Sequence, residues 1–162
     1  MKLLVSRERR SPSRSIAPPR AAIRIARRFS VPPAEVFDAW FDPELAGKWL
    51  FATASRPMTH VEIDARVEGF FRLAQQRDRE LIEYTGHYVE IVPPRRLVFT
   101  LSMEEHWYVT TRVTVELSAM RAGCQLSLVH DDVPSHYADY TEGRWTGMLY
   151  GLDVILSGKR GW

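Results

Sequence analysis

The sequence predicts an α+β fold, in which a curved antiparallel sheet closes over one long C-terminal helix and two short helices follow the first strand. Three observations lead to this prediction. Apolar residues recur at helical spacing in residues 34–50 and again in residues 135–156. Between these segments they alternate with polar residues, as in half-buried strands. Because these strands follow one another without intervening helices, we expect antiparallel pairing.

Residues 135–156 form the longest predicted helix, and the rest of the chain supplies the sheet that buries it. Its other side holds Gly143, Gly147 and Gly151, and each glycine weakens a helix by roughly 1 kcal/mol relative to alanine. Close approach of another element, such as a second copy of the chain, would explain these glycines. We expect the simpler alternative, in which packing of the apolar side alone stabilises a poor helix former. That apolar side has amphipathic spacing and consists of Trp145, Met148, Leu149, Leu152, Ile155 and Leu156.

The elements before this helix follow from local signals. Residues 23–30 alternate as a strand that has Arg27 on its apolar side, and the prolines that follow end it. Two short helices are expected at residues 34–41 and 42–50, the second beginning with the cap Asp42 and a first-turn proline. Six further strands are predicted at residues 61–63, 68–76, 80–92, 96–103, 106–117 and 124–130, with Asp131 expected to end the last of them.

Composition limits the class of protein. The 162 residues are enough for one domain with a substantial core. Residues 1–20 carry a net charge of +5 and are predicted to be a disordered basic arm. Residues 21–162 are the predicted domain, and its net acidic charge gives no reason to expect nucleic acid binding. No apolar run reaches the length of a membrane span.

Cysteine and histidine usage adds two expectations. The single Cys124 excludes a disulfide within the chain and suits the reducing cytoplasm, where we expect the protein to be located. The histidines and the cysteine form no closely spaced ligand motif, so we expect neither a metal site nor a cofactor.

Several segments resemble one known family. RFSVPPAEVF (residues 28–37) with Trp40, followed by DPEL (residues 42–45) and Trp49, resembles the start of the Hsp90 ATPase activator homologue-like proteins. These proteins belong to the START-like (SRPBCC, Bet v-like) superfamily, which has a helix-grip fold. The similarity spans about residues 22–157. It continues through GFFR, GHYVEIVPPRRLVFT and LSLVH, which begin at residues 69, 86 and 126, and ends with Trp145, Leu149 and Leu152.

Two residues depart from the family pattern. Arg144 stands where family members usually have a glycine directly before the helix tryptophan, and Glu68 replaces the first of two paired glycines. The resemblance implies a helix-grip fold with a ligand-holding cavity between the sheet and the last helix. It does not fix the function, because the superfamily includes lipid carriers, hydrophobic-ligand binders, polyketide cyclases and co-chaperone modules.

The first functional hypothesis is a non-enzymatic protein that binds a small hydrophobic or amphipathic ligand in that cavity. His130 lies on the inward side of its strand pattern and would supply a polar contact. Arg72 would bind a carboxylate if it points inward, which the pattern of its strand does not decide. Core packing or a surface position is the alternative interpretation of every candidate. The candidate ligand-binding residues are Trp49, Phe51, Arg72, His87, Trp107, Thr111, His130, Trp145, Met148, Leu149 and Leu152.

Two other functions stay open. The resemblance alone implies a co-chaperone-like module that stimulates an Hsp90-type ATPase, which would make a chaperone the partner. A polyketide cyclase-like enzyme would need His130 to act with Arg72 or Glu83 as acid and base. The sequence shows no Ser/His/Asp arrangement, phosphate loop or paired carboxylates, so no catalytic residue is predicted. We expect a monomer or a homodimer.

Overall fold

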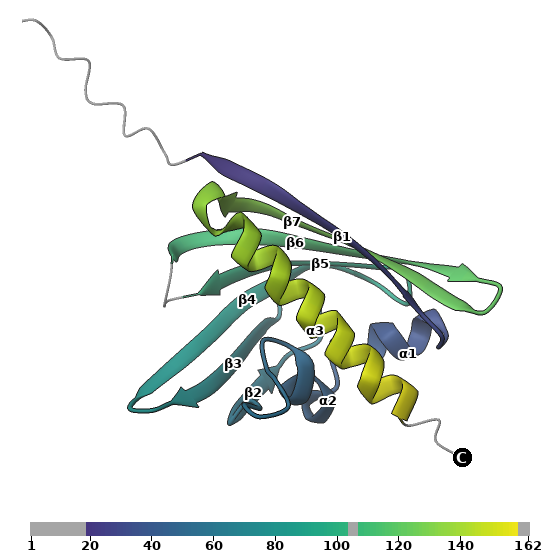
Figure 1. The fold of residues 1–162 in the computed structure, drawn as a ribbon, viewed down its shortest axis with the longest axis horizontal. Helices are drawn as coiled ribbons and strands as arrows, with labels where there is room; N and C mark the ends of the chain where they lie inside the picture. Colours follow the sequence, from purple (N-terminus) through teal and green to yellow (C-terminus); the bar gives the residue numbers. More distant parts are fainter. Residues whose placement is uncertain (1–18, 104–106, 159–162) are drawn as a thin grey trace, which may run out of the picture.

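The computed structural model describes residues 19–103 and 107–158, which form one sheet with one long helix across it (Figure 1). The first strand is followed by two short helices, and six more strands precede the long helix. The elements are β1 (Arg20–Phe29), α1 (Pro33–Asp38), α2 (Pro43–Trp49), β2 (His60–Ile63), β3 (Phe70–Arg77), β4 (Glu80–Val92), β5 (Arg96–Met103), β6 (Trp107–Met120), β7 (Gly123–Pro134), a 3₁₀ turn (Ser135–Tyr137) and α3 (Ala138–Gly158).

The seven strands form one antiparallel sheet in the order β1-β7-β6-β5-β4-β3-β2. Strands β2 to β7 are therefore neighbours in chain order, and β1 joins the sheet beside β7. The long helix α3 crosses one face of this curved sheet, and α1 and α2 lie beside its C-terminal half (Figure 1). This arrangement confirms the predicted α+β helix-grip fold, including the two short helices after the first strand.

Alternation along β6 and β7 decides which face of the sheet carries the core. Val113 and Val115 of β6 are fully buried, and their cross-strand partners on β7 are the equally buried His130 and Leu128. The residues between them reach the opposite, polar face. Because side chains alternate along a strand, this pairing places both apolar sets under α3, as the sequence predicts.

The sequence left open which face of the β3–β4 hairpin points inward, and cross-strand packing settles it. Phe71 is buried and lies opposite Gly86, where a Cβ atom would come within 1.8 Å of the Thr100 carbonyl oxygen and 2.7 Å of the Phe71 ring. Glycine is therefore needed at this position to let the Phe71 ring lie against the backbone of β4. Tyr84 and Tyr88 share this inner face.

The prediction that Asp131 ends the last strand is wrong, because β7 continues to Pro134. Asp132 has φ +65°, and the register between β1 and β7 shifts between Ala21 and Ile23. Such a bulge accommodates one extra residue on β7, so the ladder resumes beyond it. Arg20 therefore pairs in the sheet rather than belonging to the predicted arm, whose residues 1–18 lie outside the described part.

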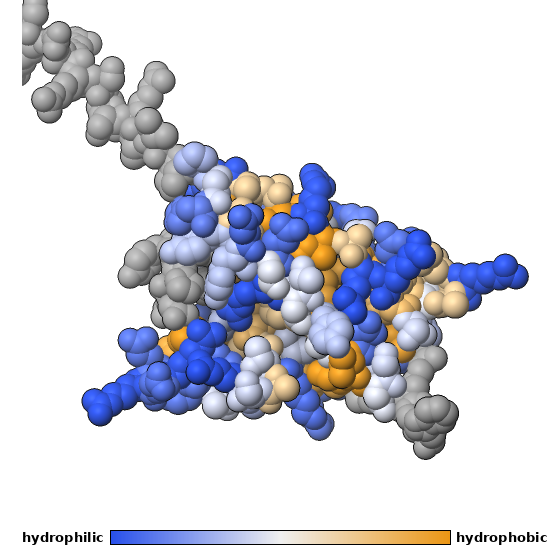
Figure 2. All heavy atoms as spheres, viewed as in Figure 1, coloured by the Kyte–Doolittle hydropathy of each residue, from blue (hydrophilic) through white to orange (hydrophobic). Residues whose placement is uncertain are grey.

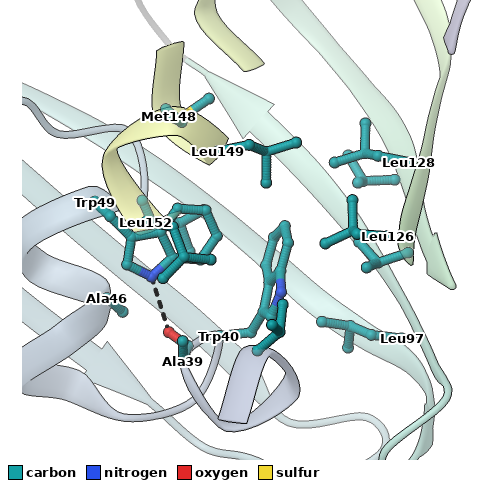
Figure 3. Close-up of a cluster of buried hydrophobic side chains, with 14 of the residues drawn as sticks. Ala39, Trp40, Ala46, Trp49, Leu97, Leu126, Leu128, Met148, Leu149 and Leu152 are labelled. Atoms are coloured by element: carbon teal, nitrogen blue, oxygen red, sulfur yellow. Dashed lines mark hydrogen bonds between the residues drawn. The ribbon is translucent and has the colours of Figure 1, made fainter. Parts of the chain in front are cut away.

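The core forms where α1, α2 and α3 meet the sheet (Figure 3). Trp40 packs edge-on against Trp49, with ring centroids 4.7 Å apart, and lies 6.0 Å from the Trp145 ring. The indole N–H of Trp49 donates to the Ala39 carbonyl at 3.0 Å, which fixes the end of α2 against α1 (Figure 3). These aromatic contacts bury large apolar areas and orient the rings at the same time.

Arg27, the arginine on the inward side of β1, connects the sheet to the helix. Its guanidinium donates to the Asp153 carboxylate of α3 at 2.8 Å, and it lies 5.5 Å from the centre of the Tyr150 ring. This ion pair anchors the C-terminal half of α3 to the edge strand of the sheet.

Candidate functional site

The space between α3 and the sheet is filled rather than open. The void between α3 and the sheet measures only about 20 Å³, and a second void, of about 10 Å³, lies between the ends of α1 and α2 and the sheet. One water needs roughly 10–15 Å³, whereas sites for small organic ligands measure several hundred. The described residues therefore do not enclose the ligand cavity predicted at this place. Trp40, Leu126 and Leu149 are among the side chains that occupy it (Figure 3).

A buried hydrogen-bond chain runs from α3 into the sheet. The Trp145 indole N–H donates to Nδ1 of His130 at 3.0 Å, and Nε2 of His130 lies 2.7 Å from the Thr111 hydroxyl. The Thr111 hydroxyl in turn donates to the Leu101 carbonyl at 3.1 Å. All three side chains are about 1 % exposed.

These contacts fix the tautomer of His130. An indole N–H can only donate, so Nδ1 must accept and the ring proton resides on Nε2, where it can be donated to Thr111. Burial lowers the pKa of His130 to about 4. His130 is therefore a neutral structural link between β7, β6 and α3, and the hydrogen bonds described use both of its ring nitrogens.

Phe51 lines the 20 Å³ void between α3 and the sheet. Its ring stacks on Tyr84 with centroids 4.6 Å apart, its N–H donates to the Met148 sulfur at 2.9 Å, and its carbonyl accepts from Arg144 at 3.3 Å. Its φ of +56° lies in the left-handed region, which is unfavourable for an aromatic residue. Three partners therefore hold Phe51 in a strained conformation at the boundary between the core and the surface.

A much larger opening lies on the other side of α3. A groove of about 750 Å³ runs between the helix and the segment that follows α2. Figure 2 shows the face that carries α3, where hydrophobic residues reach the surface in separate patches between hydrophilic ones. The helix contributes Gly143, Gly147, Gly151, Met148, Tyr150 and Val154 to the groove. The facing wall consists chiefly of Trp49, Ala52, Ala54 and Pro57.

The facing wall is held in place by backbone hydrogen bonds. Thr53 and Arg56 exchange N–H···O bonds of 3.2 and 3.1 Å, and the Met58 N–H donates to the Gly47 carbonyl of α2 at 2.8 Å. The buried Gln75 of β3 donates its side-chain amide to the Arg56 carbonyl. The groove is therefore preformed on this side.

The glycines of α3 form the open side of the groove. An ideal Cβ atom built on Gly143, Gly147 or Gly151 meets no atom within 4 Å. Tyr150 and Val154 beside them are 61 % and 54 % exposed. Close approach of another part of the described chain therefore does not explain these glycines, and their absent side chains are what keep the groove deep.

Alanine at Gly147 is expected to stabilise the protein by about 0.5–1 kcal/mol, because it lowers the entropy of the unfolded chain and meets no neighbour in the folded one. Chemical denaturation of the G147A variant measures this gain. The matched control is Gly86→Ala, which must be strongly destabilising because its Cβ atom would overlap the Thr100 carbonyl. An equal response of the two variants would contradict the expectation.

Arg144 lies between the groove and the interior and lines both the groove and the 20 Å³ void. It donates to the Tyr84 hydroxyl at 3.1 Å as well as to the Phe51 carbonyl. Its guanidinium also lies 5.7 and 5.9 Å from the ring centres of Tyr84 and Tyr140. The guanidinium beside the 20 Å³ void is therefore that of Arg144, which sequence analysis noted only as a departure from the family pattern.

Two predicted site residues lie on the opposite face of the sheet. Arg72 is half-buried on the outer face and hydrogen-bonds the Glu83 carboxylate through Nε at 3.1 Å. His87 is exposed on the same outer face, beside the edge of β3. Because the sheet separates them from the interior, neither reaches His130 or the groove. Of the two positions that the sequence left open for Arg72, the structure therefore has the outer one, and the hypothesised pairing of His130 with Arg72 or Glu83 is not formed.

The other predicted residues gather on the α3 side of the sheet. The 20 Å³ void is lined by Phe51, His130, Trp145 and Met148. Thr111 lies behind His130 and is hydrogen-bonded to it. Trp49 and Met148 also line the outer groove, whereas Leu149 and Leu152 are fully buried core residues. The side chain of Trp107 lies outside the described residues.

Within residues 19–103 and 107–158, no group of three His, Cys, Asp or Glu side chains is arranged to hold a metal ion. No helix in this described part is long and apolar enough to cross a membrane. Cys124 is fully buried, and burial raises the pKa of its thiol, which makes it an unreactive core residue.

Solved structures share this fold. Protein CV1439 from Chromobacterium violaceum superimposes with a TM-score of 0.76 at 26% identity, covering 83% of this chain and 95% of its own. Protein SA2116 from Staphylococcus aureus, described as of unknown function, gives 0.79 at 16% identity with 90% and 99% coverage. An AHSA1-like protein from Aeromonas hydrophila gives 0.71 at 22% identity with 85% and 94% coverage. The last two likenesses concern the fold alone.

A search of curated proteins found no match. Residues 30–157 match the family model for "Activator of Hsp90 ATPase homolog 1-like protein", which covers most of the chain and agrees with the resemblance seen in the sequence. The chain therefore belongs to this family and, with it, to the START-like superfamily.

Proposed function

We propose that this protein binds a small apolar or amphipathic molecule in the groove between α3 and residues 48–57. The observation that carries the proposal is the glycine side of α3. Because these glycines have no side chains, a groove of about 750 Å³ stays open beside the exposed Tyr150 and Val154. This site differs from the expected one, because the space between the helix and the sheet is filled.

The size and chemistry of the groove support the proposal. Ligand sites typically measure about 300–1,000 Å³ and combine apolar walls with a few polar groups. Trp49, Ala52, Pro57 and Met148 supply such walls, and the hydroxyl of Thr53 and the cation of Arg144 supply polar contacts. The hydrogen bonds that hold residues 53–58 reduce the ordering that a ligand must impose, which favours binding.

Native mass spectrometry of gently purified protein, followed by a thermal-shift screen of lipophilic compounds, tests for a ligand. The G147L variant tests the location. Its Cβ atom would meet no atom of the described chain within 4 Å and its side chain would take up volume in the groove, so the variant is expected to fold and to lower ligand affinity about tenfold or more.

The matched control is Thr146→Leu, which adds a similar apolar side chain to the exposed side of α3 outside the groove lining. It is expected to keep the ligand affinity of the natural protein. Equal binding by natural protein and the Gly147→Leu variant would place any ligand elsewhere, and a protein that retains and binds nothing would remove the proposal.

The family's description favours stimulation of an Hsp90-type ATPase, but no particular surface of the described residues supports it. A chaperone partner and a cytoplasmic location therefore remain predictions from the sequence.

A further inference from the structure

We infer that the molecule bound in the groove carries an anionic head group, which Arg144 holds while the apolar tail lies along the glycine side of α3. This inference rests on the proposed function and adds the chemical class of the ligand. Three observations lead to it: the charge of the groove lining, the partners of Arg144 and the position of Arg144 relative to the apolar walls.

The charged side chains of the groove have one sign. Lys48 and Arg144 line it, and no acidic residue of the described chain does. Lys48 is 56% exposed and lies 3.7 Å from the Glu44 carboxylate, so solvent and a neighbour already compensate its charge. Of the two cations, Lys48 and Arg144, the half-buried one is Arg144, and its position therefore decides where an anion would bind.

The partners of Arg144 in the described chain are neutral. They are the Tyr84 hydroxyl, the Phe51 carbonyl, the Tyr140 side chain and the aromatic rings of Tyr84 and Tyr140. None of the hydrogen bonds and ring contacts that Arg144 makes within residues 19–103 and 107–158 involves a carboxylate. A half-buried cation is normally paired with an anion, because the low dielectric around it makes an uncompensated charge costly. Neutral contacts orient the guanidinium but leave its charge available to a ligand.

The geometry suits an amphiphile rather than a free anion. Arg144 lies one helical turn before Met148 and next to Gly143 and Gly147, so apolar wall and cation belong to one continuous stretch of the groove. A guanidinium fixed by two hydrogen bonds binds an oxyanion in a defined direction, and the same chemistry serves a carboxylate and a phosphate monoester. The tail would then cover the exposed Tyr150 and Val154.

Isothermal titration calorimetry with decanoate, 1-decanol, decyl phosphate and decyltrimethylammonium at neutral pH and below their micelle concentrations tests the inference. We expect the anionic probes to bind about ten to a hundredfold more tightly than the alcohol, since hydrogen bonds to charged groups account for such factors. The stronger of the two anions identifies the head group. The cationic probe is expected to bind most weakly.

Variants then assign the preference to Arg144. Arg144→Gln is expected to bring the ratio of decanoate to decanol affinity close to one, whereas Arg144→Lys retains part of it. Arg121→Gln, which removes an equal charge at the exposed β6–β7 turn, is the control and should keep the full ratio. Circular dichroism and unfolding curves confirm that each variant is folded, and the comparison of probes on the natural protein needs no variant.

Each outcome bears on one statement. If decanol binds as tightly as decanoate, or if the cation binds best, the anionic head group is wrong and the groove remains a ligand site. If Arg121→Gln lowers the ratio as much as Arg144→Gln does, the preference comes from overall charge and the assignment to Arg144 falls. If no probe binds and native mass spectrometry finds no ligand, the proposed function itself is wrong.

Discussion

Replacing Trp145 with alanine is expected to lower the free energy of unfolding by about 3–5 kcal/mol. Trp145 is 1% exposed, packs against Trp40 and Phe51, and donates its indole N–H to His130. The substitution would leave a cavity in the middle of the core and remove the donor on which Nδ1 of His130 depends. Both losses act on the folded state, so urea unfolding should show a lower midpoint.

Phenylalanine variants separate the hydrogen bond from the packing. Trp145→Phe removes the donor to His130 but keeps an aromatic ring, and Trp40→Phe makes the same change at another buried tryptophan. The indole N–H of Trp40 is buried and has no acceptor within the part of the chain that the structure describes. Trp145→Phe should therefore cost about 1–3 kcal/mol more than Trp40→Phe. Equal costs would mean that the bond to His130 contributes little to stability.

The fold was predictable because its signals are local. Period-two alternation in β6 and β7, and the Asp42-Pro43 start of α2, depend on residues close in sequence, and both predictions hold. The bulge at Asp132 depends instead on the register between β1 and β7, whose residues are about a hundred positions apart. An alternating pattern does not indicate such a register shift, so the strand predicted at residues 124–130 ended too early.

The site was harder to predict because it depends on volume and orientation. The sequence shows that Trp49, Trp145 and Leu149 are apolar, but it does not show whether their side chains enclose a cavity or fill it. The same holds for Arg72, since alternation divides a hairpin into two faces without telling which one is inner. Only the packing of Phe71 against Gly86 decides that question.

The groove had a sequence signal whose meaning was missed. Gly143, Gly147 and Gly151 recur at one-turn spacing, and the interpretation as a poor helix former left no role for the space beside them. Arg144, a lone cation on this side of α3 and a departure from the family pattern, pointed to the same place. Tyr84 and the wall at Ala52 and Pro57 gave no signal, because only tertiary contacts bring them there.

Acidification is expected to destabilise the protein through His130. In the unfolded chain this histidine titrates near its ordinary pKa of 6.5, whereas burial lowers the pKa to about 4 in the folded protein. Between these values the unfolded state binds a proton that the folded state does not, so the free energy of unfolding falls as the pH falls. The contribution is fully present above the unfolded pKa and is lost by about pH 4, at a total of about 3 kcal/mol.

The His130→Asn variant isolates this contribution. An asparagine oxygen can still accept the Trp145 indole N–H, but the side chain does not titrate, and the polar link to Thr111 is lost. The variant should be less stable than the natural protein at neutral pH, yet lose less stability on acidification, so the two curves of unfolding free energy against pH converge toward pH 4. Protonation of the folded natural protein would add a proton at Nδ1, which then faces the Trp145 donor, and Arg144 adds a second positive charge to the same void. Parallel curves of unfolding free energy against pH would show that His130 takes up a proton as readily in the folded state as in the unfolded state. The buried hydrogen-bond chain from Trp145 to Leu101 would then not require a neutral imidazole.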